Sequence, residues 1–144
     1  MGMPHMRHHS LPLLLSTLLA ACAFDVVKLD LVPATLAPPQ TTATSFTLRA
    51  SANVKLSTGY SRTLKTGTVW HPAGSLPEGG VFRTQDQVLT VEGSNIHEAY
   101  IVVKGTQLVG FYLPANGTYS PLEPPVDLQF LTSDGKNFVP AGGS

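Results

Sequence analysis

Histidine, serine and acidic side chains in the middle of the chain are the residues with the clearest potential for chemistry. His71 and His97 could hold a zinc ion with an acidic residue if the fold brought them together. Ser75, His71 and Asp86 supply the three side-chain types of a nucleophilic triad. No HExxH, GxSxG or Cys-His cluster accompanies them, and neighbouring strand residues such as His97 and Glu98 point to opposite faces. The sequence therefore predicts no metal, no cofactor and no enzymatic activity.

A second group of residues, Tyr60, Arg62, Trp70 and His71, is suited to binding. Tyrosine, tryptophan and arginine are enriched where proteins contact their partners. Residues 59–62 lie between two expected strands, and Trp70 and His71 lie at the start of an expected loop. Each also has a structural interpretation, because Tyr60 could cover the end of the domain and Trp70 could fill its core. These four residues are the candidate ligand or partner site.

The single cysteine, Cys22, stands at the end of an apolar run over residues 11–19. Before it come a short start with Arg7 and then Leu19-Ala20-Ala21. A charged start, an apolar core of about 7–15 residues and small residues at the end describe a secretory signal. The run is too short to span a membrane, which takes about 20 apolar residues. Residues 1–21 are therefore expected to be a signal peptide.

Leu19-Ala20-Ala21-Cys22 resembles the lipobox of bacterial lipoproteins. The resemblance implies cleavage before Cys22 and attachment of lipid, including palmitate, to that residue. Ala23 takes the place of the aspartate that favours inner-membrane retention in enterobacterial lipoproteins, which implies the outer membrane with the domain facing the periplasm. The alternative is an ordinary signal peptide cut near Ala21. A lipidated cysteine would also leave no spare thiol in an oxidising compartment.

Composition narrows the classes of partner and fold. Removing residues 1–21 takes away Arg7 and no acidic residue, so the mature chain is close to neutral. It has no basic stripe for nucleic acid and no polybasic patch for anionic lipid. Charged residues make up 12% of the chain, alongside 13 glycines and 12 prolines. This mixture favours short strands and many turns over long helices.

The best-defined element is a hairpin over residues 99–113. Residues 100–104 and 107–112 flank Gly105-Thr106, and glycine first in a two-residue loop suits a type II′ turn. This turn pairs Lys104 with Gln107 and, further along, Ile101 with Gly110. Both faces of the hairpin are apolar, which predicts a central place in the fold. Replacing Gly110 by valine should then overpack the site and destabilise the fold.

The remaining elements are expected as follows. Residues 22–44 are a tether rich in proline and threonine, in which residues 25–32 could be a strand. Residues 45–131 are an antiparallel β-barrel or β-sandwich, with strands near residues 46–49, 53–57, 68–70, 81–84 and 88–91. Residues 71–80 are expected to be a loop that could contain a short strand around Ser75 and Leu76. A short strand from Tyr119 and a last strand over residues 126–131 follow. Residues 132–144 are a flexible tail.

These patterns predict a lipid-anchored envelope protein with a non-enzymatic binding or scaffolding role in a larger assembly. One alternative is a module for a small ligand or glycan, with a pocket formed by Trp70, Tyr60 or Tyr112. Another is an inhibitor of an envelope-attacking hydrolase, which needs a protruding loop such as residues 71–80. The sequence leaves these alternatives open.

Overall fold

The computed structural model describes residues 2–4, 28–85, 87–132 and 134–137. The described residues form a mainly β, antiparallel structure without helices, as the sequence predicts. They contain no helix long and apolar enough to cross a membrane. The strands, in chain order, are β1 (Val32–Pro33), β2 (Thr47–Leu48), β3 (Ala52–Lys55), β4 (Ser61–Leu64), β5 (His71–Leu76), β6 (Gly79–Arg83), β7 (Thr90–Glu92), β8 (Ile96–Glu98), β9 (Tyr100–Lys104), β10 (Gln107–Leu113), β11 (Thr118–Asp127) and β12 (Phe130–Leu131).

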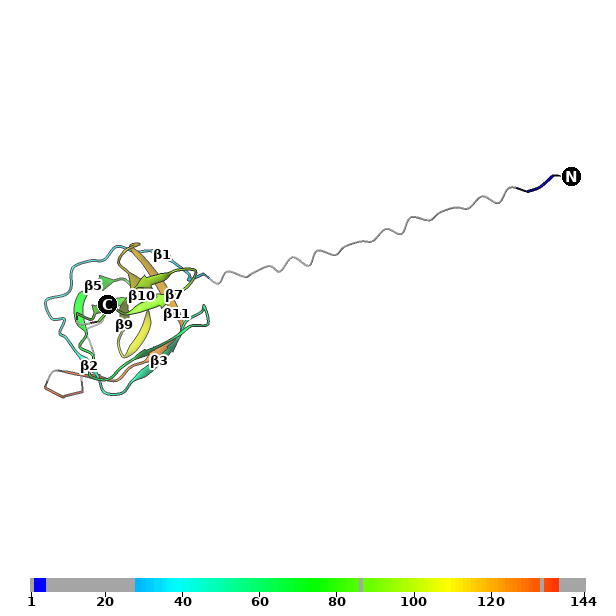
Figure 1. The fold of residues 1–144 in the computed structure, drawn as a ribbon. Coiled ribbons are helices and arrows are strands. Elements are labelled where there is room, and N and C mark those ends of the chain that lie inside the picture. The colour runs from blue at the N-terminus through cyan, green and yellow to red at the C-terminus, as the bar shows by residue number, and fades with distance from the viewer. Residues whose placement is uncertain (1, 5–27, 86, 133, 138–144) are drawn as a thin grey trace.

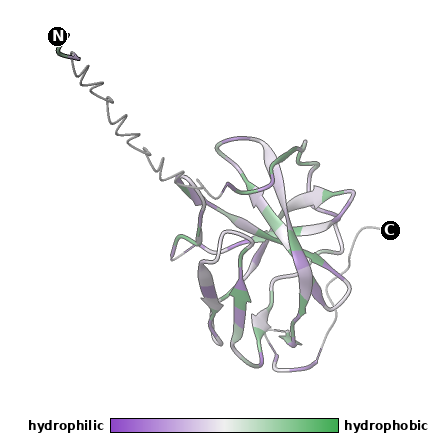
Figure 2. Cartoon of the chain, turned by 90° about the vertical axis from the view of Figure 1, so that its right-hand side faces the viewer, coloured by the Kyte–Doolittle hydropathy of each residue, from purple (hydrophilic) through white to green (hydrophobic). Residues whose placement is uncertain are grey.

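Six of these strands form the main sheet, in the order β1-β11-β10-β9-β6-β5 (Figure 1). Three small sheets, β3-β4, β7-β8 and β2-β12, complete the strand pairing. No ladder joins β1 to β5 among the described residues, so a closed barrel is not observed. Hydrophobic residues recur along the strands that cross the middle of the domain (Figure 2). The arrangement is closer to a sandwich, in which small sheets cover one face of a larger one.

The main sheet is buried on both faces, as the two apolar faces of the central hairpin predict. On one face, Ile101 and Val103 of β9 belong to the main core, together with residues of the small sheets such as Val54, Leu64 and Phe130. The opposite face carries a second cluster, which includes Val102 of β9 and Tyr112 of β10, with Ala34 and Leu36 packed against it. Alternate residues of β9 thus contribute to different cores, because successive side chains point to opposite faces.

The described part of the expected tether lies along this sheet. Residues 28–31 have no strand structure, while Val32 and Pro33 pair with β11. Ala37 and Ser75 exchange backbone hydrogen bonds of 2.9 Å. Residues 34–36 therefore help to cover the second core instead of standing away from the domain. Residues 22–27, including Cys22, lie outside the described residues, as does the expected signal peptide from residue 5 onwards.

The prediction of a loop over residues 71–80 is wrong, although the short strand that it allowed around Ser75 and Leu76 is part of β5. These residues form most of the β5-β6 hairpin of the main sheet, connected by Pro77 and Glu78. Pro72 is tolerated because β5 lies at the edge of the main sheet. The N–H that proline lacks would not be needed for a ladder with another strand on the outer side of β5. A methyl group on Gly79 would lie 2.3 Å from the Val103 oxygen, so glycine there allows close approach to β9. The protruding loop required of a hydrolase inhibitor is thus absent at this place.

The hairpin of β9 and β10 has the expected turn but only part of the expected register. Gly105 has φ +60, and no described non-glycine residue has positive φ, which fits the type II′ turn. Lys104 faces Gln107, as predicted. The register then shifts between Leu108 and Gly110, so that Gly110 faces Val102 and not Ile101. The extra residue, a β-bulge, could not be read from the apolar pattern.

Tyr119 of β11 packs against this bulge. Its hydroxyl donates a 2.7 Å hydrogen bond to the Val109 carbonyl. Burial, reinforced by the carboxylates of Glu78 and Glu123, raises the pKa of Tyr119 to about 12. The neutral phenol is therefore strongly favoured in the folded protein.

β11 is longer than the short strand expected before Pro121. It continues to Asp127 through three prolines, with a second irregularity opposite the β10 bulge. Among the described residues, only Val32 and Pro33 pair with the other edge of β11. The prolines of β11 therefore remove few hydrogen bonds on that side, because a proline lacks the N–H that would donate one.

Further elements also differ from expectation. β4 and β8 were not predicted, and of the strand expected over residues 68–70 only Trp70 pairs, in an isolated bridge with Phe46. Within the described part of the expected tail, Asn137 bridges back to Leu131.

Candidate functional site

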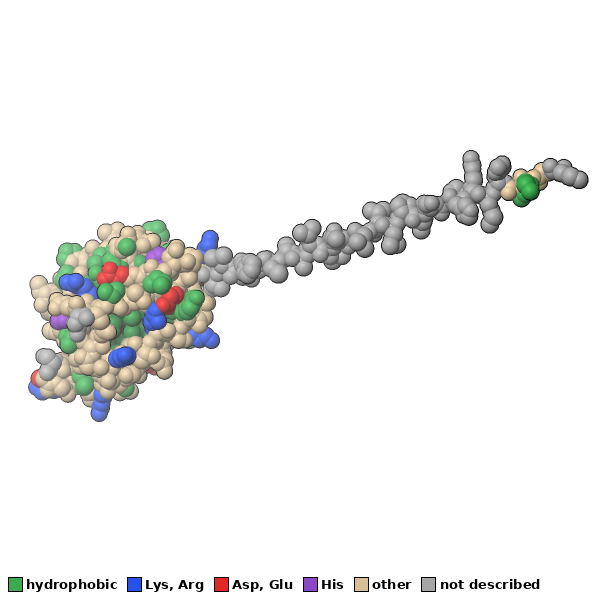
Figure 3. Space-filling view, viewed as in Figure 1, with side chains coloured by type: hydrophobic (Ala, Val, Ile, Leu, Met, Phe, Trp, Pro, Cys, Tyr) green, Lys and Arg blue, Asp and Glu red, His purple; other side chains and the backbone are tan. Residues whose placement is uncertain are grey.

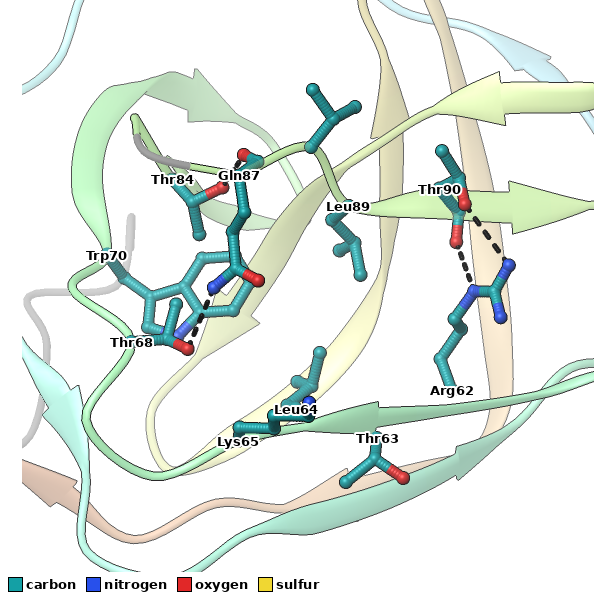
Figure 4. Close-up of a pocket in the computed structure, with 11 residues that line it drawn as sticks. Arg62, Thr63, Leu64, Lys65, Thr68, Trp70, Thr84, Gln87, Leu89 and Thr90 are labelled. Atoms are coloured by element: carbon teal, nitrogen blue, oxygen red, sulfur yellow. Dashed lines mark hydrogen bonds between the residues drawn. The ribbon is translucent and has the colours of Figure 1, made fainter.

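One cavity lies between β4 and a wall formed by Thr84 and residues 87–90, which lead into β7. Its volume is about 200 Å³, and its lining includes Arg62, Leu64, Lys65, Trp70, Gln87 and Leu89. Two elements distant in sequence therefore form opposite walls (Figure 4). The cavity combines an apolar base with polar and cationic groups, which is the usual composition of a small-ligand site.

Trp70 is held at this site by its backbone. Its N–H donates a 2.8 Å hydrogen bond to the Phe46 carbonyl, and the Phe46 N–H donates a 3.0 Å bond to the Trp70 carbonyl. The side chain is 2% exposed and belongs to the main core. Its Nε1 atom is buried and has no hydrogen-bond partner among the described residues. Trp70 is thus a core residue with one unsatisfied donor next to a cavity.

Arg62 joins the two walls at one end of the cavity. Its Nε donates a 2.7 Å hydrogen bond to the Thr90 carbonyl, and its Nη2 donates a 3.1 Å bond to Thr90 Oγ1. The same Nη2 forms an ion pair with Glu92 Oε1. Thr58 in turn donates a 2.9 Å bond to the Glu92 carbonyl. The guanidinium therefore fastens β4 to β7 and has part of its charge balanced by Glu92.

Gln87 closes the opposite end of the cavity. Its side-chain Nε2 donates a 3.0 Å hydrogen bond to Thr68 Oγ1. The backbone carbonyl of Gln87 accepts a hydrogen bond from the Thr84 hydroxyl. Figure 4 shows the Gln87 side chain extending across to Thr68 beside the Trp70 indole. The tryptophan ring is consequently covered and offers no exposed face for stacking.

The structure brings together two of the four predicted site residues. Arg62 and Trp70 line the same cavity, whereas Tyr60 and His71 are not among its lining residues. Tyr60 is 54% exposed in the turn before β4. His71 Nδ1 is 2.9 Å from Ser45 Oγ, in a hydrogen bond that links β5 to the segment before β2. Tyr112, proposed for an alternative pocket, packs against Tyr100 with ring centroids 6.2 Å apart.

The other chemical constellations are not assembled among the described residues. The hydroxyl partner of His71 is Ser45 and not Ser75, and Asp86 lies outside the described residues. His97 lines a separate cavity of about 100 Å³ that also includes Lys28 and Leu31. The described part of the chain contains no group of three or more His, Cys, Asp or Glu side chains that could hold a metal ion.

Several lining residues were missed by reasoning from sequence. Lys65 reads as a turn residue, and Thr68, Gln87 and Leu89 read as parts of ordinary strands and turns. No local pattern marks them, since only packing of Thr84 and residues 87–90 against β4 places them around one cavity.

The face drawn in Figure 3 carries scattered acidic and basic side chains without a broad patch of one sign. Comparison of the chain with protein-family models, with curated proteins and with solved structures gave no significant match.

Proposed function

We propose that this chain is a lipid-anchored protein of the bacterial envelope whose β domain has a non-enzymatic binding or scaffolding role. The observation that carries the proposal is the Leu19-Ala20-Ala21-Cys22 motif after an apolar run. Ala23 after the cysteine supports the outer membrane as the location. The paired strand β1 begins only ten residues after Cys22, so even a fully extended connection would span about 35 Å. The domain would thus be held close to the membrane.

The anchor is tested by expressing the full chain in a Gram-negative host with radiolabelled palmitate. We expect a labelled protein in the outer-membrane fraction, with a mass that shows cleavage before Cys22 and attached lipid. Cys22→Ala should lose the label. A product that still begins at Met1, or one with a free thiol at Cys22, would contradict the proposal.

The binding role is tested by affinity capture of the lipidated protein from detergent-solubilised membranes. A scaffolding protein should retain the same envelope partner in independent preparations, and Cys22→Ala, which lacks the anchor, is the control for capture that depends on location. Absence of any reproducible partner would weaken the scaffolding role.

A second candidate function is binding of a small ligand. It is favoured by the cavity of about 200 Å³ in which Arg62 and Trp70 meet. The covered face of Trp70 does not favour a glycan, because sugar recognition by tryptophan usually uses an exposed ring face.

A further inference from the structure

We infer that one end of the domain rests on the lipid bilayer, and that three exposed apolar side chains of this end, Tyr60, Ile96 and Leu31, contact lipid. This inference rests on the proposed anchor at Cys22, since the anchor decides which end of the domain lies nearest the membrane. It adds to the anchor a surface of the domain itself. We refer to this surface as the tether end; it comprises residues 28–31, the turn between β3 and β4, and the turn between β7 and β8.

The first part of the tether end, residues 28–31, packs on the β7-β8 hairpin. Leu29 packs against the main core, and a Cβ on Gly93 would lie 3.1 Å from Cγ of Leu29. Leu31 lines a cavity of about 100 Å³ together with Ser94, which belongs to the β7-β8 turn. The segment that leads from Cys22 therefore joins the domain beside this turn.

The turn between β3 and β4 lies next to the same hairpin. Thr58 Oγ1 donates a 2.9 Å hydrogen bond to the carbonyl of Glu92, the last residue of β7. Arg62 of β4 forms an ion pair with Glu92, and Ile96 of β8 faces Glu92 in the β7-β8 ladder. Tyr60 lies in the turn, two residues before Arg62. Figure 1 shows this turn on the same side of the domain as the beginning of the described segment that leads to β1.

The tether end exposes apolar side chains from three different segments. Ile96 is 72% exposed, Tyr60 54% and Leu31 39%. The charges of Arg62 and Glu92, which lie between the segments of Tyr60 and Ile96, offset each other in their ion pair. A tyrosine ring beside aliphatic side chains is typical of the interfacial region of a membrane, where the ring contacts lipid and the hydroxyl stays in water. The composition of this end therefore suits a bilayer surface.

The length of the connection to the anchor identifies lipid as the occupant of this surface. Leu29 packs on the domain seven residues after Cys22, so even a fully extended connection spans at most about 25 Å. A folded domain of about 110 residues has a radius of gyration near 13 Å and hence a diameter of roughly 34 Å. The anchor is thus closer to the tether end than the domain is wide, and this is the end that it holds against the bilayer.

The chain contains only two isoleucines, which gives the test an internal reference. Ile96 lies at the tether end, whereas Ile101 is fully buried in the main core. The full chain would be expressed in a Gram-negative host with ¹³C-methyl isoleucine, purified, and placed in nanodiscs of phosphatidylethanolamine and phosphatidylglycerol, with or without a nitroxide on the lipid headgroups. We expect the nitroxide to remove most of the methyl signal of Ile96 and little of that of Ile101, because paramagnetic broadening falls steeply with distance.

Two variants separate contact with lipid from mere closeness to the membrane. Replacing Tyr60 and Leu31 together by serine keeps Ile96 as the reporter, and the attenuation of its signal should fall by about half, because less apolar area holds this end on lipid. Val88→Ser is the matched control, since it removes an aliphatic side chain that is 68% exposed beside the larger cavity. This control should leave the attenuation of Ile96 unchanged, and an unchanged Ile101 resonance in both variants would show an intact core.

The anchor and the surface fail in different ways. The mass of the purified protein shows whether lipid is attached to Cys22; if the thiol is free, the anchor proposal is wrong, and coupling that thiol to a maleimide lipid still allows the surface to be measured. The inference is overturned if, in a tethered protein, the nitroxide leaves Ile96 unaffected or attenuates Ile96 and Ile101 equally. It is also overturned if Val88→Ser acts like the double variant, or if the Ile96 signal responds to protein concentration and not to the nitroxide, which would assign the surface to a second copy of the chain.

Discussion

Gly110 offers the sharpest test of the packing in the main sheet. An added Cβ there would lie 2.4 Å from the Ser120 carbonyl oxygen and 2.4 Å from Cε2 of Tyr119. Neither neighbour is free to move: Ser120 is in the β10-β11 ladder opposite Phe111, and the Tyr119 ring is fixed by its hydrogen bond to Val109. Gly110→Ala must therefore displace either the strand or the ring.

Overpacking of a tight site typically costs ~1–3 kcal/mol, and contacts this short with a backbone atom place Gly110→Ala at about 3 kcal/mol. For a domain of this size, the melting temperature should fall by roughly 10 °C. The assay is equilibrium unfolding in urea, followed by the fluorescence of Trp70 and by far-ultraviolet circular dichroism. Trp70 is a suitable reporter because its buried indole becomes exposed on unfolding.

Gly105→Ala is the matched control. A Cβ there would meet nothing within 4 Å, but the residue has φ +60. Only backbone strain opposes the methyl group, so we expect a loss of about 1 kcal/mol. If Gly110→Ala were no more destabilising than Gly105→Ala, or left the unfolding midpoint unchanged, the close packing of Tyr119 on the bulge would be refuted.

Two further predictions concern stability. The pKa of Tyr119 rises from 10.0 to about 12 in the folded protein, so the stabilisation linked to its neutral phenol is complete below pH 10 and should be lost as pH rises towards 12. Across this range the free energy of unfolding should fall less steeply in Tyr119→Phe than in the unchanged protein. Equal slopes would contradict the pKa shift. Arg62→Met removes the ion pair and leaves the half-buried carboxylate of Glu92 without it, which should cost about 2 kcal/mol in urea unfolding. The double variant Arg62→Met, Glu92→Gln should recover part of that loss, whereas full additivity of the two changes would argue against coupling.

The local elements of this fold could be predicted where a short stretch determines its own conformation. Gly105-Thr106 between two apolar runs was sufficient for the β9-β10 hairpin and its turn, and the two apolar faces of Tyr100–Lys104 were sufficient for its central position. Gly59, Gly67 and Gly117 all have positive φ, the backbone conformation that glycine supplies in tight turns. In each case the deciding interaction joins residues a few positions apart.

Predictions failed where the outcome depends on neighbours distant in sequence. Pro72 suggested a loop, yet β5 is a strand because its place at the end of the sheet makes the missing N–H harmless. Gly110 was paired with Ile101, yet a bulge stabilised by Tyr119 shifts it to Val102.

By itself, the sequence determined a mainly antiparallel β domain, its central hairpin, and the motif around Cys22 on which the proposed location depends. Only the tertiary structure decided that Arg62 and Trp70 share a cavity with Lys65 and Gln87, while Tyr60 and His71 lie elsewhere. The physical reason is that a turn or an alternating strand depends on adjacent residues. A cavity, in contrast, depends on how β4 packs against Thr84 and residues 87–90, and no short stretch of sequence specifies that packing.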